Sequence, residues 1–298
     1  MLNKLLLIHN WCILEYGHTE SLKGAMMFKT VRESFKITNG NIVIATPLIF
    51  FSLISSLYMI FSYNANIIGQ IFSVILFFLM FGAFLSGWFY MILKAVKEPD
   101  IEDNQLITDF PSGVGEYFLS ALGLIFQVIF VFSIIIIAAV FAGKKIIGGF
   151  GISYSQVVQA ASSMETMKTF VDSLSQEQLI KINQWNILMF CAVVFNYFII
   201  MLYPAVILFK NKNPFKAFFI SLKDTFGHRF FKNVGLFIFI FSVYTLISIG
   251  TMLLGKNIIL HFIFTLLNFY YITFAGVLLF NYYYSNFIRI GSNIDETV

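Results

Sequence analysis

Six basic residues gather between two long apolar segments in the second half of the chain, where they could bind anionic groups. They are Lys210, Lys212, Lys216, Lys223, Arg229 and Lys232. Basic side chains at a membrane surface attract the phosphates of anionic lipids, each by on the order of 1 kcal/mol. The cluster therefore predicts contact with lipid headgroups. A compatible alternative is that these residues only fix the orientation of the chain in the membrane.

Two prolines and one amide lie inside apolar segments, where helix-breaking or polar residues can mark a ligand site. Pro47 and Pro204 interrupt the first and fourth of these segments, and Asn196 lies deep in the fourth. In transporters, broken helices bind substrates near the middle of the membrane. The structural alternatives are a kink repaired by neighbouring helices and an interhelical hydrogen bond from the amide. The three residues thus mark either helix kinks or a transport pathway.

The elements that must position these residues are six stretches without Asp, Glu, Lys or Arg. They cover residues 41–63, 67–93, 117–142, 186–209, 233–255 and 258–280. Roughly 20 apolar residues in a helix cross the hydrocarbon core of a bilayer. We therefore predict an all-α polytopic membrane protein with six transmembrane helices in a single domain over residues 27–285.

The composition excludes several classes of function. A chain that is 59% hydrophobic and 11% charged cannot cover its surface with polar groups in water. Its net charge is +4, with no basic run long enough for a nucleic-acid tract. The histidines and cysteines share no metal-ligand spacing, and no span supplies the acid and base that catalysis needs. We expect no enzymatic activity, no nucleic-acid partner, no metal and no cofactor.

Amphipathic segments precede the first, third and fifth spans. The clearest begins at Asn213 and Pro214, an N-cap residue followed by a first-turn proline, and stops at Gly227. Its apolar residues recur at helical spacing: Phe215, Phe218, Phe219, Leu222 and Phe226. A similar segment covers residues 28–40, with an apolar side formed by Phe28, Val31 and Phe35, and a shorter one covers residues 106–115. We predict three interfacial helices on one side of the membrane.

The distribution of Lys and Arg predicts the orientation. If the N-terminus is cytoplasmic, the inner segments hold 14 of these residues and the outer segments hold 5. Positive residues favour the cytoplasmic side, so both termini are predicted inside, with a cytoplasmic tail at residues 286–298. Residues 143–185 form the long outer loop. There, apolar residues between 157 and 171 predict a helix, and Ser175 to Gln178 form a capping box.

The first 26 residues do not read as a signal peptide, because their apolar run is short and is broken by His9, Asn10 and Glu15. Lys23, Gly24 and Ala25 are what an in-frame ribosome-binding site would encode. We therefore expect residues 1–26 to be a non-native upstream extension, with translation starting at Met26 or Met27. The mass of the native protein tests this expectation.

The order of elements resembles a broad group of bacterial six-helix membrane proteins. This group includes the YciC-like proteins and the membrane domain found beside some glycerophosphodiester phosphodiesterases. The resemblance covers nearly all of the chain from Met27 onward. It rests on residues 35–47 (FKITNGNIVIATP), on Gly82 to Gly87 leading to residues 107–110, and on Tyr203 and Pro204 followed by residues 217–223 and Asn233. It implies a fold and an inner-membrane location. The phosphodiesterase activity is not implied, because the metal-binding carboxylates and histidines of that domain are absent.

Two functions remain open at this point. The first is a non-enzymatic membrane-organising or accessory protein that contacts lipid or a membrane-protein partner. The second is a transporter or permease for a small or lipidic substrate, with Pro47, Asn196 and Pro204 near its pathway.

Overall fold

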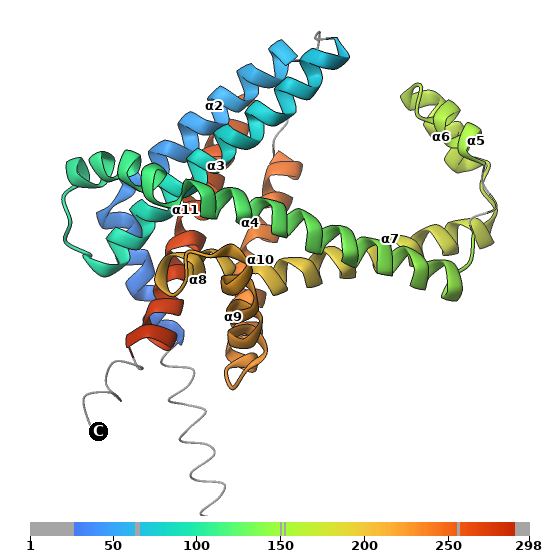
Figure 1. The fold of residues 1–298 in the computed structure, drawn as a ribbon. Coiled ribbons are helices and arrows are strands. Elements are labelled where there is room, and N and C mark those ends of the chain that lie inside the picture. The colour runs from blue at the N-terminus through green and yellow to red at the C-terminus, as the bar shows by residue number, and fades with distance from the viewer. Residues whose placement is uncertain (1–26, 63–65, 150, 152, 255–256, 290–298) are drawn as a thin grey trace, which may run out of the picture. The chain divides into compact units, whose positions relative to one another are not determined.

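The computed structural model describes residues 27–62, 66–149, 151, 153–254 and 257–289. The predictions for residues 1–26, including the translation start at Met26, lie outside this part of the chain, as does the tail beyond residue 289. Within the described residues every regular element is a helix and there is no strand. The predicted all-α fold class is therefore confirmed (Figure 1).

Six helical segments of the described chain are long and apolar enough to cross a membrane. They are Ile42–Ile60, Ile67–Lys97, Asp103–Ile146, Gln176–Phe209, Phe230–Leu254 and Ile258–Ile288. At 1.5 Å per residue, the shortest of them reaches about 28 Å, close to the thickness of a bilayer core. The chain is thus a multi-pass membrane protein by the length and composition of its helices.

The chain forms two compact units. One contains the described residues up to Ile125 and from Met201 onward, and the other is Phe126–Ile200. The basic cluster, Pro47 and Pro204 all belong to the first unit, whereas Asn196 belongs to the second.

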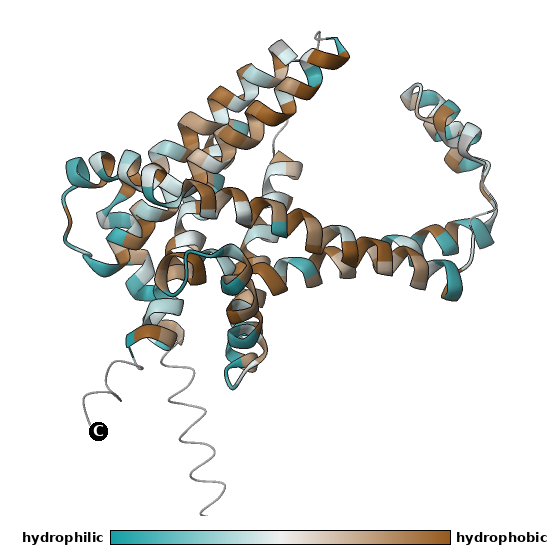
Figure 2. Cartoon of the chain, in the orientation of Figure 1, coloured by the Kyte–Doolittle hydropathy of each residue, from teal (hydrophilic) through white to brown (hydrophobic). Residues whose placement is uncertain are grey.

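In the first unit, helices α2 (Ala45–Ser62) and α3 (Ile67–Lys97) form an antiparallel hairpin (Figure 1). Both are hydrophobic along most of their length (Figure 2). Phe51 of α2 stacks on Phe84 of α3 at 4.4 Å between ring centroids, and Phe84 stacks in turn on Trp88 of its own helix at 5.6 Å. The buried residues of α3 lie between Gly82 and Val96, so the start of the helix presents its apolar side chains outward. Such a surface is stable in lipid, where apolar side chains need no cover.

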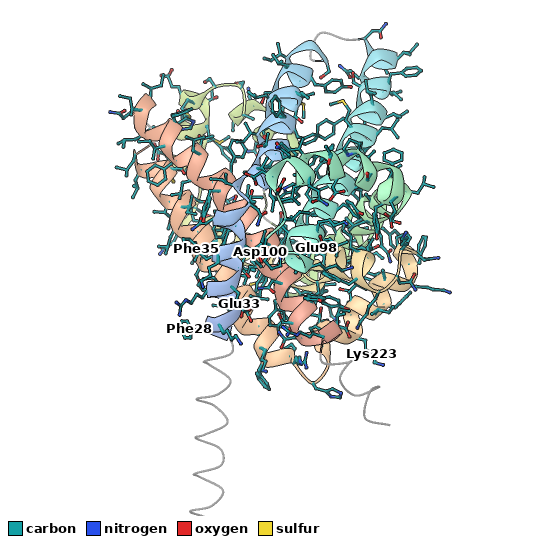
Figure 3. All side chains as sticks on the ribbon, turned by 90° about the vertical axis from the view of Figure 1, so that its left-hand side faces the viewer. Phe28, Glu33, Phe35, Glu98, Asp100 and Lys223 are labelled. Atoms are coloured by element: carbon teal, nitrogen blue, oxygen red, sulfur yellow. The ribbon has the colours of Figure 1, made fainter. Side chains whose placement is uncertain are left out.

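The chain enters this hairpin through a separate helix over residues 27–40, followed by a 3-10 turn at Ile42–Ile44. The predicted apolar side of this helix faces outward, with Phe28 and Phe35 on the same side (Figure 3). The side that packs against the protein combines the buried Ile37 with three buried hydroxyl residues, Thr30, Ser34 and Thr38. Small hydroxyl side chains allow this because they bond back to their own helix: Ser34 donates to the Thr30 carbonyl, and Thr38 to the Ser34 carbonyl.

The interfacial segment predicted before the third span is not a separate helix. Helix α4 runs without a break from Asp103 to Ile146, with Pro111 inside it. The proline ring removes one hydrogen bond to the preceding turn but does not end the helix here. At 44 residues, α4 is about 66 Å long, roughly twice the thickness of a bilayer core. The predicted segment at 106–115 is the first part of this helix.

From Met201 onward, the described residues of the first unit form four further α-helices. They are α8 (Tyr203–Phe209), α9 (Pro214–Phe226), α10 (Phe230–Leu254) and α11 (Ile258–Tyr283), which continues as a π-helical turn at Tyr284–Ile288. Helix α10 packs against α11 along its length, and the Tyr271 hydroxyl donates to the Ile240 carbonyl. The largest fully buried side chains include Met91 and Ile92 of α3, Tyr203 and Ile207 of α8, and Tyr283 of α11. The core therefore lies where α3, α8 and α11 meet.

The second unit contains most of the loop over residues 143–185 that the sequence predicts on the outer side. The helix predicted between residues 157 and 171 is broken into α5 (Tyr154–Ala160) and α6 (Met164–Asp172). The break arises because Ser163 caps α6, accepting from the Thr166 amide, in a capping box that the prediction overlooked. The predicted box at Ser175 is confirmed: its amide donates to Gln178 Oε1, and Ser175 Oγ accepts from the Gln178 amide before α7 (Gln176–Ile200).

Helices α4 and α9 approach closely at a glycine. A Cβ atom on Gly123 would lie 2.4 Å from Pro214 Cγ, whereas a Cβ on Gly115 of the same helix would meet nothing within 4 Å. We expect Gly123→Ala to destabilise the protein by about 1–3 kcal/mol, because the rigid proline ring must move. Gly115→Ala is the matched control and should be neutral or stabilising by up to about 1 kcal/mol, since alanine favours a helix. Thermal unfolding in detergent measures both, and equal effects would contradict the close approach.

Candidate functional site

Helix α9 is held by the local chemistry that the sequence predicts. Asn213 Oδ1 accepts from the Lys216 amide, Pro214 occupies the first turn, and Gly227 follows the last residue. The preceding loop is fixed to α4, because Ser120 Oγ donates to the Lys212 carbonyl over 2.7 Å. With 13 residues, α9 is about 20 Å long and too short to cross a bilayer core.

The exposed side of α9 combines aromatic and basic residues. We call this set the α9 face: Phe215, Lys216, Phe219, Lys223 and Phe226, all exposed. The opposite side, with Ala217, Phe218 and Ser221, is buried. The two lysines are seven residues apart and lie on one side of the helix, next to the phenylalanines. Hydrophilic residues gather at this end of the first unit (Figure 2), and Lys223 projects from it (Figure 3).

The structure separates the six predicted basic residues into groups with different surroundings. Lys210 Nζ lies 2.9 Å from Asp224 Oδ2, and Lys212 Nζ lies 2.6 Å from Glu116 Oε1. Lys216 and Lys223 form no ion pair with any described residue. Lys232 is half-exposed near the start of α10. Only part of the predicted cluster therefore presents unpaired charge to a headgroup.

A polar network that the sequence did not reveal joins α8, α9, α10 and α11. We call it the α9–α10 junction: Lys210, Asp224, Arg229, Asn233, Tyr282 and Tyr283. Tyr283 Oη donates to Asp224 Oδ2 over 2.6 Å, so this carboxylate oxygen accepts from both a tyrosine and Lys210. Asn233 Nδ2 donates to the carbonyls of Asp224 and Thr225, and Asn233 Oδ1 accepts from Tyr282 Oη.

The sequence contains the residues of this junction in positions that have a more common explanation. Tyr282 and Tyr283 stand at the end of a span, where tyrosine commonly lies among lipid headgroups. Here both are buried and bond to protein. Asn233 is the first residue of a charge-free stretch. Nothing in the sequence indicates that its side-chain amide bonds to the end of α9 and so holds the turn between α9 and α10.

Both prolines lie near helix starts. Pro47 lies in the first turn of α2, where a missing amide costs no helical hydrogen bond, so it does not kink the middle of a span. Pro204 lies at the start of α8, after a break at Met201 and Leu202 that divides the fourth span into α7 and α8. The predicted interruption at Pro204 is therefore a break, and the one at Pro47 is a helix start.

Pro47 lines a cavity of about 580 Å³ formed by α2, α3 and the first part of α4. Its lining is apolar apart from Thr46 and consists of Thr46, Pro47, Phe50, Phe51, Ile54, Met80, Ala83, Phe84, Met91, Ile107, Phe110 and Pro111. Pro204 does not line it. Asn196, on α7 in the other unit, is buried, and its Oδ1 has no hydrogen-bond partner among the described residues.

None of the described residues forms a group of three or more His, Cys, Asp or Glu side chains that could hold a metal ion. The chemistry of the first unit is instead that of paired and unpaired cations, buried amides and an apolar cavity. In comparisons with known proteins, no family model, curated protein or solved structure matches the chain.

Proposed function

We propose that the protein is a non-enzymatic membrane-organising or accessory protein of the bacterial inner membrane, with both termini cytoplasmic, that binds anionic lipid through the α9 face. The observation that carries this proposal is the combination of two unpaired, exposed lysines with three exposed phenylalanines on a helix too short to span the bilayer. Such a helix buries its apolar side among acyl chains and holds its lysines among phosphates.

The other basic residues do not carry the proposal. The charges of Lys210 and Lys212 are already balanced by Asp224 and Glu116. The resemblance to YciC-like membrane proteins supports the inner-membrane location. In this proposal a membrane-protein partner shares the same surface. We propose no cofactor and no nucleic-acid partner.

The test reverses the two unpaired charges. The double variant Lys216→Glu/Lys223→Glu should weaken retention of anionic lipid by at least about 2 kcal/mol, because each lysine contributes on the order of 1 kcal/mol and the new carboxylates repel phosphate. Native mass spectrometry of the protein with phosphatidylglycerol measures the retention.

The matched control is Lys144→Glu/Lys145→Glu, which makes the same change in net charge at two exposed lysines near the end of α4. This variant should retain lipid as the parent does. Equal loss in both variants would show that only net charge matters, and unchanged retention in the α9 variant would remove the proposal.

A transporter or permease for a small or lipidic substrate is the second candidate, and the cavity beside Pro47 favours its lipidic form. An almost wholly apolar lining suits hydrocarbon rather than a polar solute. Reconstitution into vesicles with fluorescent phospholipid tests it: transfer of lipid between leaflets would support transport, and its absence would leave the accessory role.

A further inference from the structure

The α9–α10 junction contains more positive than negative charge. Lys210 and Arg229 both lie close to the Phe287 ring, with Lys210 Nζ 5.6 Å and Arg229 Cζ 4.9 Å from its centroid. Asp224 is the carboxylate that pairs with Lys210, and it also accepts from Tyr283. Arg229 forms no ion pair with any described residue.

The guanidinium of Arg229 is left with an unused donor. Its Nη1 atom is buried and has no hydrogen-bond partner among the residues that the structure describes. Arginine cannot lose its charge in a protein, so the group cannot become neutral to suit its surroundings. A buried donor that carries charge is costly unless it is paired with an acceptor. This arrangement calls for an anion.

The position of Arg229 is also fixed before any ligand arrives. Its carbonyl accepts from the Asn233 amide over 2.9 Å, and the Asn233 side chain bonds to the carbonyls of Asp224 and Thr225 at the end of α9. Phe287 packs on the guanidinium and is itself stacked on Tyr283, at 4.9 Å between ring centroids. A cation held in this way loses little freedom on binding.

Two buried hydroxyl groups that precede Arg229 in the chain differ in their hydrogen bonding from buried hydroxyl groups on other helices. Ser34, Thr38 and Thr273 donate to carbonyls of their own helices. Ser221 Oγ and Thr225 Oγ1, eight and four residues before Arg229, are buried and have no hydrogen-bond partner in the described part of the chain. The end of α9 thus holds several polar groups that the protein itself does not satisfy.

From these observations we propose that Arg229 anchors a phosphate group at the α9–α10 junction. A planar guanidinium donates two parallel hydrogen bonds to phosphate, which a lysine cannot reproduce. The phosphate can belong to a lipid headgroup or can be free inorganic phosphate. The lipid source rests on the proposed function, because the α9 face would bring headgroups to this end of the protein, whereas the free-phosphate source does not.

The experiment compares Arg229→Gln, Arg229→Lys and the full-length parent in a neutral detergent. Titration with inorganic phosphate, against chloride at equal ionic strength, should raise the melting temperature of the parent. Arg229→Gln should weaken phosphate binding on the order of tenfold, the difference expected for losing charge-assisted hydrogen bonds. Arg229→Lys should be intermediate, since it keeps the charge but loses the paired geometry.

Lys212→Gln is the matched control. It removes one positive charge near the same end of the protein, but one that Glu116 already pairs, so it should bind phosphate as the parent does. The melting temperature without phosphate checks that every variant is folded. If Arg229→Gln does not fold, phosphate binding is compared between Arg229→Lys and the parent.

Native mass spectrometry with phosphatidylglycerol tests the lipid source. Loss of a bound lipid in Arg229→Gln supports a headgroup ligand, and loss of stabilisation by inorganic phosphate supports a free ion. If both ligands bind equally to the parent and to the Arg229 variants, the site does not exist. A failure of the Lys216 and Lys223 test with an intact Arg229 effect would remove the proposed function and leave this site.

Discussion

Replacement of Asn233 by alanine should destabilise the protein by about 3 kcal/mol or more, because it leaves several buried polar groups without partners. Asn233 is fully buried, and its side chain makes three hydrogen bonds, at 3.0, 2.9 and 2.8 Å, to Asp224, Thr225 and Tyr282. Two of them satisfy carbonyls at the end of α9, where the helix supplies no further amides. Thermal unfolding of the purified protein in detergent measures the loss.

Asn39→Ala is the control for this prediction. Asn39 also bonds to a tyrosine through its side chain, accepting from Tyr270 Oη over 2.6 Å, but it is exposed. Water can replace that single bond, so the variant should lose less than about 1 kcal/mol. If the two variants are destabilised alike, Asn233 does not hold the turn between α9 and α10.

The second large effect is expected at Asp224. Replacement by alanine should lower the free energy of unfolding by about 3 kcal/mol, because Lys210 and Tyr283 lose the acceptor that they share. Water cannot easily replace this acceptor, since the Asp224 side chain is only 14% exposed. The loss should appear as a lower unfolding temperature and as weaker docking of the loop between α8 and α9, which limited proteolysis after Lys210 or Lys212 would report.

The comparable exposed pair supplies the control. Glu116 and Lys212 have side chains that are 40% and 56% exposed. Surface ion pairs contribute between about 0 and 1 kcal/mol, so Glu116→Ala should be nearly neutral. Equal destabilisation by Asp224→Ala and Glu116→Ala would mean that burial does not distinguish the two pairs.

The features that follow from local chemistry could be predicted from the sequence. Six charge-free stretches predict six spans, and the described residues form six helical segments able to cross a membrane. Asn213, Pro214 and Gly227 predict the bounds of α9, because capping and backbone restrictions act within a few residues. The capping box at Ser175 follows the same logic.

The features that depend on distant contacts could not be predicted. A separate segment was predicted at residues 106–115, but α4 runs through it and through Pro111, since one lost hydrogen bond does not outweigh those of a 44-residue helix. Pairing of Lys210 with Asp224 requires the break at residues 210–213 to bring α8 and α9 together. The sequence shows only that both residues are polar and lie between two spans.

The helix over residues 27–40 was predicted to be interfacial, with its apolar side toward lipid, but the sequence did not show what its polar side contacts. Periodicity identified Phe28, Val31 and Phe35 as its apolar side, which in water would face the protein. In a membrane the apolar side can face lipid, and Phe28 and Phe35 do remain exposed. Ser34 and Thr38 on its polar side donate to carbonyls of their own helix, and as an acceptor Ser34 Oγ can take a further donor from elsewhere in the protein. Ser34 finds one in Asn281, whose Nδ2 donates to Ser34 Oγ over 3.0 Å.

This contact has a consequence for the order of events during synthesis. Ser34 and Asn281 are separated by 247 positions, and Asn39 and Tyr270 by 231. A ribosome that adds about 5–20 residues per second needs roughly 12–50 s to make that length of chain. Among the described helices, the first to leave the ribosome must therefore wait for the last span to be inserted before its polar side gains the contact with Asn281. Until then, that side is open to a chaperone, an insertase or another copy of the chain.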